Sequence, residues 1–220
     1  MPTTNLVFVQ SKDGNTVAGN PASLGGGTTD AHVIYEGLSR VAADAVLAGA
    51  ETIRGSDLIF SVWRKELVDL RDTMRLSRHP IQIVATLRGL SFEDTLLLNV
   101  PELQVVVLTV AACVERMNED FARRPWITLI TMAQPQDLAT AFRQLRAMGI
   151  SRISAIGGRT VARALLDARL IQDLYLTTSA RPGGKPGTPL ADKPIEGRLI
   201  VRKHGTGPDE GVVFEHLSIG

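Results

Sequence analysis

Six consecutive residues, Ala155-Ile156-Gly157-Gly158-Arg159-Thr160, combine the features of a phosphate-binding turn. Residues 151–156 predict a strand, and residues 161–170 predict a helix. Adjacent glycines let the backbone approach a ligand where a side chain would collide. The helix start adds unpaired N–H groups and the positive end of the helix dipole, which suit a phosphate. A tight strand-to-helix turn needs the same glycines, so this segment by itself is weak evidence.

Two further turns follow predicted strands and carry polar groups that suit a nucleotide. Thr52 lies in the turn 49–54, where its hydroxyl would stand beside a helix start, and a simple helix cap is the alternative interpretation. Arg88 lies in the turn 86–88, and a guanidinium can hold a phosphate through two hydrogen bonds, although an exposed loop arginine would look the same. Ligands of parallel sheets bind beyond the carboxyl ends of the strands, so we expect these turns to share one edge with the Gly-Gly turn.

The elements that position these turns alternate between strands and helices. The pattern predicts strands at residues 5–10, 44–49, 81–86, 103–109, 126–131, 151–156 and 171–179. It predicts helices at residues 31–43, 63–76, 135–148 and 161–170, with a turn or short helix at 50–54. Residues 197–203 and 211–217 follow each other without a helix, which indicates an antiparallel pair. We therefore expect an α/β fold of three αβα layers, with a mostly parallel central sheet and an antiparallel C-terminal strand pair.

The helix predicted at residues 31–43 follows a long glycine-rich loop. Its apolar positions are expected to form one broad face: Val33, Ile34, Leu38 and Val41. Thr29 or Asp30 is suited to cap its N-terminus. The preceding loop contains Gly25-Gly26-Gly27, and its length is typical of a lid or binding loop. We expect residues 19–27 to help exclude water from a bound ligand.

Composition narrows the class of protein. The 220 residues carry a formal net charge of +1 without a block of like charge, so a nucleic-acid-binding face is not indicated. Cys113 is the single cysteine and cannot form an internal disulfide, and four dispersed histidines lack the spacing of a zinc site. No apolar run approaches the length of a membrane span, and the N-terminus lacks a signal-like segment. We expect one cytoplasmic domain over residues 1–220, without a bound metal.

Three common enzyme classes lack their motifs in this sequence. A Rossmann dehydrogenase needs Gly-x-Gly-x-x-Gly after its first strand, and none follows residues 5–10. The Gly-Lys-Ser/Thr phosphate loop of nucleotide hydrolases does not occur. A nucleophilic serine between glycines on a sharp turn, as in many serine hydrolases, is not found either.

The order of several segments resembles the RibD C-terminal domain family. These segments are Ser11-Lys12-Asp13-Gly14, Thr28, residues 43–53, Gly157-Gly158 and residues 164–174. Members are riboflavin-biosynthesis pyrimidine reductases with a dihydrofolate-reductase-like fold, and the resemblance covers nearly the whole chain. It implies an NADPH-dependent reductase, often a homodimer, that passes a hydride to a pyrimidine-type substrate carrying a ribosyl phosphate. The reference activity is that of 5-amino-6-(5-phosphoribosylamino)uracil reductase.

The resemblance assigns cofactor roles to two of the turns. Gly49, Ala50 and Thr52 match the loop and helix start that hold the NADPH phosphates. Thr86 resembles the position near the adenosine ribose, and Arg88 is the candidate for the 2′-phosphate. A preference for NADPH over NADH would depend on this arginine.

The Gly-Gly turn receives the remaining cofactor roles. Gly157 and Gly158 match the glycine pair that lies against the cofactor, which a cis peptide joins in dihydrofolate reductases. Such a bond between non-proline residues costs about 3–4 kcal/mol and needs the surrounding structure to impose it. Arg159 and Thr160 match the helix start that faces the pyrophosphate.

The substrate roles implied by the resemblance fall on loop residues. Ser11 and Asp13 belong to the segment that passes under the nicotinamide, although Asp13-Gly14 alone would be interpreted as a turn. Thr28 matches a threonine near the nicotinamide and the substrate. Asp57 lies where the family usually has an aspartate that contacts substrate, and a solvated loop acid is the alternative.

Two positions depart from the family pattern. The family has a lysine four residues before the serine of Ser11-Lys12-Asp13-Gly14, where this chain has Val7. It has a glutamate directly before the glycine pair, where this chain has Ile156. Apolar side chains cannot supply the hydrogen bonds that a sugar phosphate needs. Cofactor use is therefore better supported by the sequence than the identity of the substrate.

Three functions remain open at this stage. Ile-Gly-Gly is closer to dihydrofolate reductases, which bind the pterin ring through a carboxylate on the first helix, where this chain offers Asp30 and, further along, Glu36. A helix N-cap is the simpler interpretation of Asp30. A reductase of another small substrate and a non-catalytic NADPH-binding protein are the alternatives to the riboflavin role. No catalytic residue is assigned, and water, Asp30 or Asp57 could donate the proton that follows the hydride.

Overall fold

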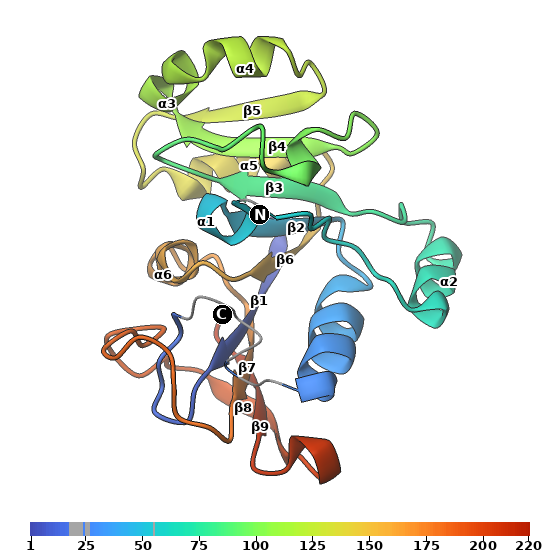
Figure 1. The fold of residues 1–220 in the computed structure, drawn as a ribbon, viewed down its shortest axis with the longest axis vertical. Coiled ribbons are helices and arrows are strands. Elements are labelled where there is room, and N and C mark those ends of the chain that lie inside the picture. Colours follow the sequence, from blue (N-terminus) through green and yellow to red (C-terminus); the bar gives the residue numbers. More distant parts are fainter. Residues whose placement is uncertain (18–23, 25–26, 55) are drawn as a thin grey trace.

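The computed structural model describes residues 1–17, 24, 27–54 and 56–220. Within them, nine strands form one sheet: β1 (Thr3–Gln10), β2 (Ala45–Gly49), β3 (Ile81–Ala85), β4 (Val105–Val110), β5 (Ile127–Met132), β6 (Arg152–Ile156), β7 (Asp173–Thr178), β8 (Arg198–His204) and β9 (Val213–Ser218). The order is β5-β4-β3-β2-β6-β1-β7-β9-β8 (Figure 1). Strands β1 to β7 pair in parallel, whereas β9 pairs antiparallel with β7 and with β8. The predicted mostly parallel sheet with an antiparallel C-terminal pair is confirmed.

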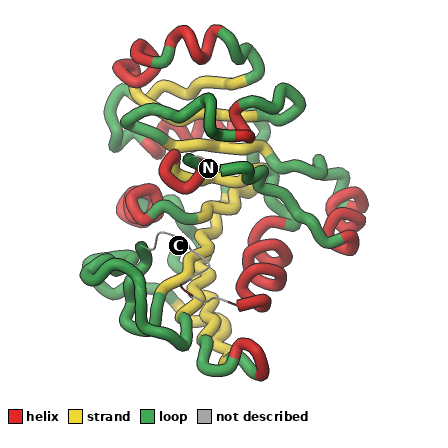
Figure 2. Tube along the Cα trace, viewed as in Figure 1, coloured by secondary structure: helices red, strands yellow, loops and turns green. Residues whose placement is uncertain are grey.

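Helices connect most of the parallel strands (Figure 2). The α-helices are α1 (Ala50–Ile53), α2 (Lys65–Thr73), α3 (Ala111–Arg116), α4 (Asn118–Ala122), α5 (Leu138–Ala147) and α6 (Arg159–Asp167). A π-helix, η2 (Thr29–Arg40), and two 3₁₀ turns, η3 (Leu96–Leu98) and η4 (Gly207–Asp209), complete the described elements. The prediction missed α3 and α4, which are too short to show a helical period. None of the described helices has the length and apolarity that a bilayer crossing requires.

Alternate residues of each strand enter different cores, which gives the molecule its layers. On β4, Val106 and Leu108 pack with α5 and α6 in one cluster. Val105 and Val107 of the same strand pack in a second cluster that includes residues of α1, α3 and α4. Because side chains alternate across a strand, these clusters lie on opposite faces of the sheet. The expected αβα layering is therefore confirmed.

Helix η2 corrects one detail of the sequence analysis. Ile34 is buried, but Val33 and Leu38 are 54% and 57% exposed, so the single apolar face predicted for this helix is wrong. A π-helix bonds residue i to i+5 and shifts the faces away from the α-helical period. Val33 and Leu38, five residues apart, consequently share the solvent side. The buried side packs against Val7 of β1 and Phe214 of β9.

A buried carboxylate on η2 fixes the start of α2. Glu36 accepts hydrogen bonds from the backbone N–H groups of Trp63 and of Arg64 (2.8 Å), and its other oxygen lies 3.1 Å from His32 Nδ1. Burial raises the pKa of Glu36, but these hydrogen bonds together outweigh it and leave the pKa below its ordinary value. Glu36 thus caps α2 from another helix.

We expect Glu36→Ala to lower the free energy of unfolding by about 2 kcal/mol at neutral pH, because two N–H groups lose a charged acceptor. The folded-state pKa is depressed, so this stabilisation is complete above the ordinary pKa of 4.5 and is lost as pH falls through the folded value. Urea unfolding across pH measures it. Glu66→Ala, in the exposed first turn of α2, is the control; an equal, pH-independent loss in both variants would contradict the capping role.

Candidate functional site

The carboxyl ends of β2 and β6 meet at the centre of the sheet. Leu47 of β2 is in register with Ala155 of β6. Gly49 and Gly157 each follow that pair by two residues, so the turns after both strands begin at the same level. This places the turn into α1 beside the turn into α6, at the edge where ligands of such sheets bind.

The two turns lie close together, and glycine suits their conformation. Gly157 and Gly158 have φ values of +39° and +80°, a region that side chains disfavour. A Cβ on Gly158 would lie 3.2 Å from Thr52 Oγ1 and 3.7 Å from the Gly49 Cα. The structure thus brings Gly49, Thr52, Gly157 and Gly158 together, with Ala50 beginning α1 beside them. Among the described residues no peptide is cis, so the pair does not share the linkage of dihydrofolate reductases.

Gly49, Thr52, Gly157 and Gly158 form what we call the cradle, and the start of α6 supplies backbone donors to it. The Gly158 carbonyl accepts the first helical hydrogen bond, from Ala162 N–H (3.0 Å). The N–H groups of Arg159 and Thr160 precede that bond and have no acceptor within the helix. The Arg159 side chain instead donates from Nε to the Pro189 carbonyl (2.6 Å). Arg159 therefore offers its N–H rather than its guanidinium, and glycines, N–H groups and the Thr52 hydroxyl together fit a pyrophosphate.

Thr86 holds a turn at the carboxyl end of β3. Its hydroxyl donates to the Gly89 carbonyl (2.9 Å) and accepts from the N–H groups of Gly89 (3.0 Å) and Arg88 (3.3 Å). Thr86 is buried, and these bonds occupy its hydroxyl. A position of Thr86 near the adenosine ribose stays a prediction. In the structure Thr86 stabilises the turn.

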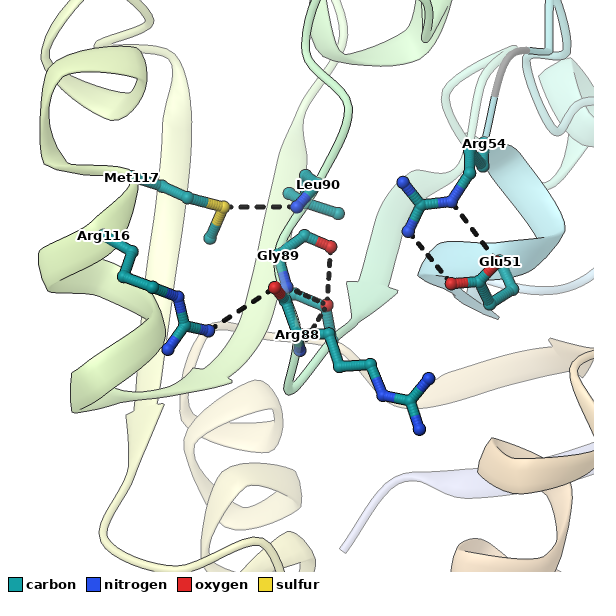
Figure 3. Close-up of polar contacts among 8 residues, drawn as sticks. Glu51, Arg54, Arg88, Gly89, Leu90, Arg116 and Met117 are labelled. Atoms are coloured by element: carbon teal, nitrogen blue, oxygen red, sulfur yellow. Dashed lines mark hydrogen bonds and ion pairs between the residues drawn. The ribbon is translucent and has the colours of Figure 1, made fainter.

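Arg88 stands on this turn with its guanidinium directed away from Arg116 and Met117 (Figure 3). The Arg88 carbonyl accepts from Arg116 Nη2 (3.4 Å), and the Leu90 N–H contacts Met117 Sδ at 3.2 Å. The turn is thus fixed from α3 while the Arg88 side chain remains exposed. A rigid turn that presents a guanidinium is suited to an anionic group.

Glu51 and Arg54 of the neighbouring α1 segment lie on the other side of Arg88. Arg54 Nη2 donates to Glu51 Oε1 (2.9 Å), and this bond, followed by the Arg54 charge, holds the pKa of Glu51 below its ordinary value. The Arg88 charge acts in the same direction. The turns after β2 and β3 therefore share one electrostatic environment. Its cationic groups, Arg54 and Arg88, lie where the sequence predicts the adenosine end of the cofactor.

Ser11 and Asp13 build a tight loop after β1. The buried Ser11 hydroxyl donates to Asp13 Oδ1 (2.5 Å), and Asp13 also accepts from Asn15 Nδ2 (3.0 Å) and the Gly183 N–H (3.1 Å). The Ser11 hydroxyl and the Gly183 N–H hold the pKa of Asp13 below its ordinary value. This loop joins the carboxyl end of β1 to the Pro/Gly-rich segment after β7. The contacts of both residues with a substrate stay predictions.

Asp30 lies at the start of η2 but does not cap it. The N-cap position is Thr28, without a side-chain capping bond, so the N-cap interpretations of Thr29 and Asp30 are wrong. Asp30 Oδ1 instead accepts from the Thr177 hydroxyl of β7 (2.5 Å). Burial, and secondarily the charge of Asp209, raise the pKa of Asp30 against the effect of this bond. A half-buried carboxyl that favours its proton is characteristic of functional sites.

The Asp30–Thr177 pair lies two strands from the glycine pair. Thr177 is in register with Val9 of β1, and Val7 is in register with Ile156, the residue before Gly157. Neighbouring strands are about 4.8 Å apart, so the pair stands about 10 Å along the edge from β6. A ligand bound at the Gly-Gly turn could therefore reach Asp30.

The other predicted positions lie around this edge. Thr28 and Asp57 are exposed. Val7 and Ile156 are buried and adjacent through their register. The predicted lid, residues 19–27, falls outside the described residues except for Leu24 and Gly27.

Two hollows in the described structure lie away from this edge. One, of about 860 Å³, opens between α6 and residues 191–196. The other, of about 390 Å³, lies near the amino ends of β3 and β4. Neither is lined by a predicted site residue. Across the described residues no three His, Cys, Asp or Glu side chains gather as a metal site would require.

Two residues that contact the start of η2, Thr177 and Asp209, are not among the positions that the sequence predicts for the site. Thr177 belongs to the strand predicted at residues 171–179. Its position near the end of that strand is the one sequence signal that it lies at the ligand-binding edge of the sheet. Asp209 lies in a Gly-Pro-Asp-Glu-Gly stretch that signals a turn. Its contact with Thr29, 180 residues earlier, has no local signal.

Comparison with protein families places this geometry in context. A family model described as the RibD C-terminal domain matches residues 2–204. No curated protein matches the chain.

Solved structures with similar folds include three reductase-related proteins. A pyrimidine reductase-like protein from Corynebacterium diphtheriae has 21% identity and a TM-score of 0.80, covering 100% of this chain and 92% of that one. RibD from Acinetobacter baumannii has 20% identity and a TM-score of 0.75. The match covers 100% of this chain and 58% of that one. The riboflavin biosynthesis reductase Rib7 from Saccharomyces cerevisiae has 15% identity and a TM-score of 0.66, at 100% and 90% coverage. The chain shares their dihydrofolate-reductase-like fold.

Asp30→Asn is expected to raise stability at neutral pH by about 0.5–2 kcal/mol, because the ionised carboxylate is poorly solvated. Asp30 has a raised folded pKa, so the variant and the native protein are equally stable below the ordinary value of 3.8. The gain of the variant grows as pH rises above 3.8 and is complete above the folded value. Urea unfolding from pH 3 to 7 measures this difference, which would be absent if Asp30 were simply solvated.

Proposed function

Since the chain belongs to the RibD C-terminal domain family, we propose that it is a reductase that uses NADPH to transfer a hydride to a pyrimidine-type substrate. The observation that carries this proposal is the cradle of Gly49, Thr52, Gly157 and Gly158 at the carboxyl ends of β2 and β6. The names of the similar folds, pyrimidine reductase-like protein and riboflavin biosynthesis reductase, support the reaction class.

The residues of the cradle bind and orient. The N–H groups of Arg159 and Thr160 and the Thr52 hydroxyl would hold the pyrophosphate, because a helix start favours an anion. Arg88 would hold the 2′-phosphate from its fixed turn. NADPH supplies a hydride when bound; the chain contributes alignment with the acceptor carbon and a dry site.

Asp30, at the acidic end of this edge, would donate the proton that the reaction needs. Reduction of a C=N or C=O group adds a hydride to carbon and a proton to the heteroatom. Asp30 suits the second task, because its raised pKa favours the protonated form and Thr177 fixes its orientation. Removal of a general acid slows a reaction about 10²–10⁴-fold. Asp30 would then be the proton donor that the sequence left open.

We expect the protein to bind NADPH and to consume it in the presence of a ribosylaminopyrimidine. Arg88→Ala should weaken NADPH binding about tenfold to a hundredfold, because a charged hydrogen bond to phosphate is lost, and should leave NADH binding unchanged. Calorimetric titration with both nucleotides measures the difference.

The matched control for Arg88 is Arg123→Ala, an exposed arginine paired with Glu119 at the end of α4. It should alter neither affinity. Absence of NADPH binding by the native protein would end the proposal. An equal loss of NADPH and NADH affinity in Arg88→Ala would remove only the 2′-phosphate assignment.

The apolar surface that Val7 and Ile156 form between the two ends of the site favours a second candidate, a reductase of a less polar substrate. We call this surface the floor of the site. Val7 and Ile156 are adjacent across β1 and β6, and each is 4% exposed. The family positions are lysine and glutamate, so the departures remove two opposite charges from one spot. A substrate that leaves its sugar phosphate elsewhere, or lacks one, suits this floor better.

Restoring the two charges tests this relation. We expect Val7→Lys and Ile156→Glu each to lower the free energy of unfolding by about 2–4 kcal/mol, since each buries an unpaired charge. The double variant should be less destabilised than the sum by about 1 kcal/mol or more, because the charges pair across the strands. Urea unfolding of the native protein, the two single variants and the double variant gives the free energies of this double-mutant cycle. Strict additivity would show that the two positions are independent.

Two further expectations belong to the proposal. A non-catalytic NADPH-binding protein is the alternative if the cofactor binds and no pyrimidine, pterin or small carbonyl compound is reduced. The homodimer implied by the resemblance stays a prediction. Strand β8 is an edge with Leu199, Ile200 and Val201 each 42% exposed, and it is where we propose that a second copy would bind.

A further inference from the structure

A second carboxylate, from a distant part of the chain, contacts the residue directly before Asp30. Asp209 belongs to η4, in the connection between β8 and β9, and is only 7% exposed. Its Oδ2 atom accepts from the Thr29 hydroxyl (2.5 Å) and from the Thr29 backbone N–H (3.2 Å). Asp209 therefore holds the residue directly before Asp30.

The backbone around Asp209 is shaped to receive it. A Cβ on Gly27 would lie 1.9 Å from Asp209 Oδ1, and one on Gly205 would lie 2.0 Å from the Asp209 carbonyl oxygen. At Gly205 the clash is with backbone, and at Gly27, where φ is +76°, a side chain would displace the Asp209 carboxylate. The Asp209 N–H donates to the Thr206 carbonyl (3.2 Å), and its carbonyl accepts from Val212 N–H (3.0 Å). The carboxylate is therefore built into the junction of η2 and η4.

Among the described residues, Asp209 is the charged group that acts on Asp30. From β7, Thr177 contributes a neutral hydroxyl. On η2 itself, His32 is directed to Glu36. From η4, Asp209 contributes a like charge that acts on Asp30. No arginine or lysine in the described residues forms an ion pair with either aspartate.

We propose that Asp209 is a positioning residue for Asp30: its buried carboxylate anchors the start of η2 through Thr29 and places a second acidic group near the Asp30 carboxyl. Two nearby carboxylates in a half-buried site cannot both ionise as easily as one, so Asp30 retains a proton more readily. The catalytic use of that proton rests on the proposed function. There the proton leaves the Asp30 carboxyl for the substrate nitrogen or oxygen, and water returns one afterwards.

The direct test is carboxyl ¹³C NMR of aspartate-labelled, ligand-free protein across pH, with Asp30→Asn used to assign the Asp30 signal. In Asp209→Asn the amide oxygen can still accept from Thr29 while the charge is gone. We expect the Asp30 titration midpoint to fall in this variant. It should stay in place in Asp57→Asn, which neutralises an exposed aspartate. An unchanged or raised midpoint in Asp209→Asn overturns the proposal.

The native protein alone provides a second readout if Asp209→Asn does not fold. Coupled carboxyls report each other's titration. The Asp209 signal should therefore carry an inflection at the pH where Asp30 titrates. Its absence overturns the proposal without any variant of Asp209.

Kinetics separate this inference from the proposed function. If the protein is a reductase, kcat of Asp209→Asn should decline with rising pH from a lower pH than in the native enzyme, with KM for NADPH unchanged. Asp209→Ala, which also removes the anchor, should additionally raise KM for the pyrimidine. A native kcat profile retained in Asp209→Asn overturns the catalytic part. If no acceptor is reduced, the proposed function fails, and the NMR midpoint still decides the coupling of the two aspartates.

Discussion

The close approach of the turns after β2 and β6 is the constraint on which the site depends. Parallel pairing sets the two strands at one level, so the chain must leave both at the same place. Glycine suits both turns, because a Cβ on Gly158 would lie 3.2 Å from Thr52 Oγ1 and one on Gly49 would lie 3.0 Å from Val161 Cγ2. The same approach leaves the donors of the α6 start beside a hydroxyl with no side chain between them. Tight packing of the fold and access for an anion therefore have one cause.

Charge is distributed along the edge so that its two ends can do different work. Beyond β2 and β3, the charges of Arg54 and Arg88 both act on Glu51. Beyond β7, the Asp209 charge acts on Asp30, and no ion pair joins either aspartate to a lysine or arginine among the described residues. A ligand with phosphates at one end and a reactive ring at the other would be oriented by this asymmetry alone. Val7 and Ile156 provide an apolar floor between the two ends, so orientation there must come from shape rather than from hydrogen bonds.

Local patterns predicted most of the fold and the glycine cradle. Strand periodicity located all nine strands, and the Gly-Gly turn has a sequence signature because its φ values demand glycine. The winding of η2 was not predictable, since α and π helices share composition and differ in which residues face inward. The Asp30–Thr177 and Thr29–Asp209 contacts join residues 147 and 180 positions apart. No local pattern encodes such contacts, so the N-cap interpretation of Asp30 was the one that propensity favoured.

The most direct measurement of the central claim is an amide NMR titration of the ¹⁵N-labelled protein with NADPH. We predict that the largest shift changes fall on the N–H groups of residues 49–52 and 157–160, with smaller changes at the turn 86–89. Changes confined to other surfaces, such as the hollow between α6 and residues 191–196, would contradict the assignment of the cradle as the cofactor site.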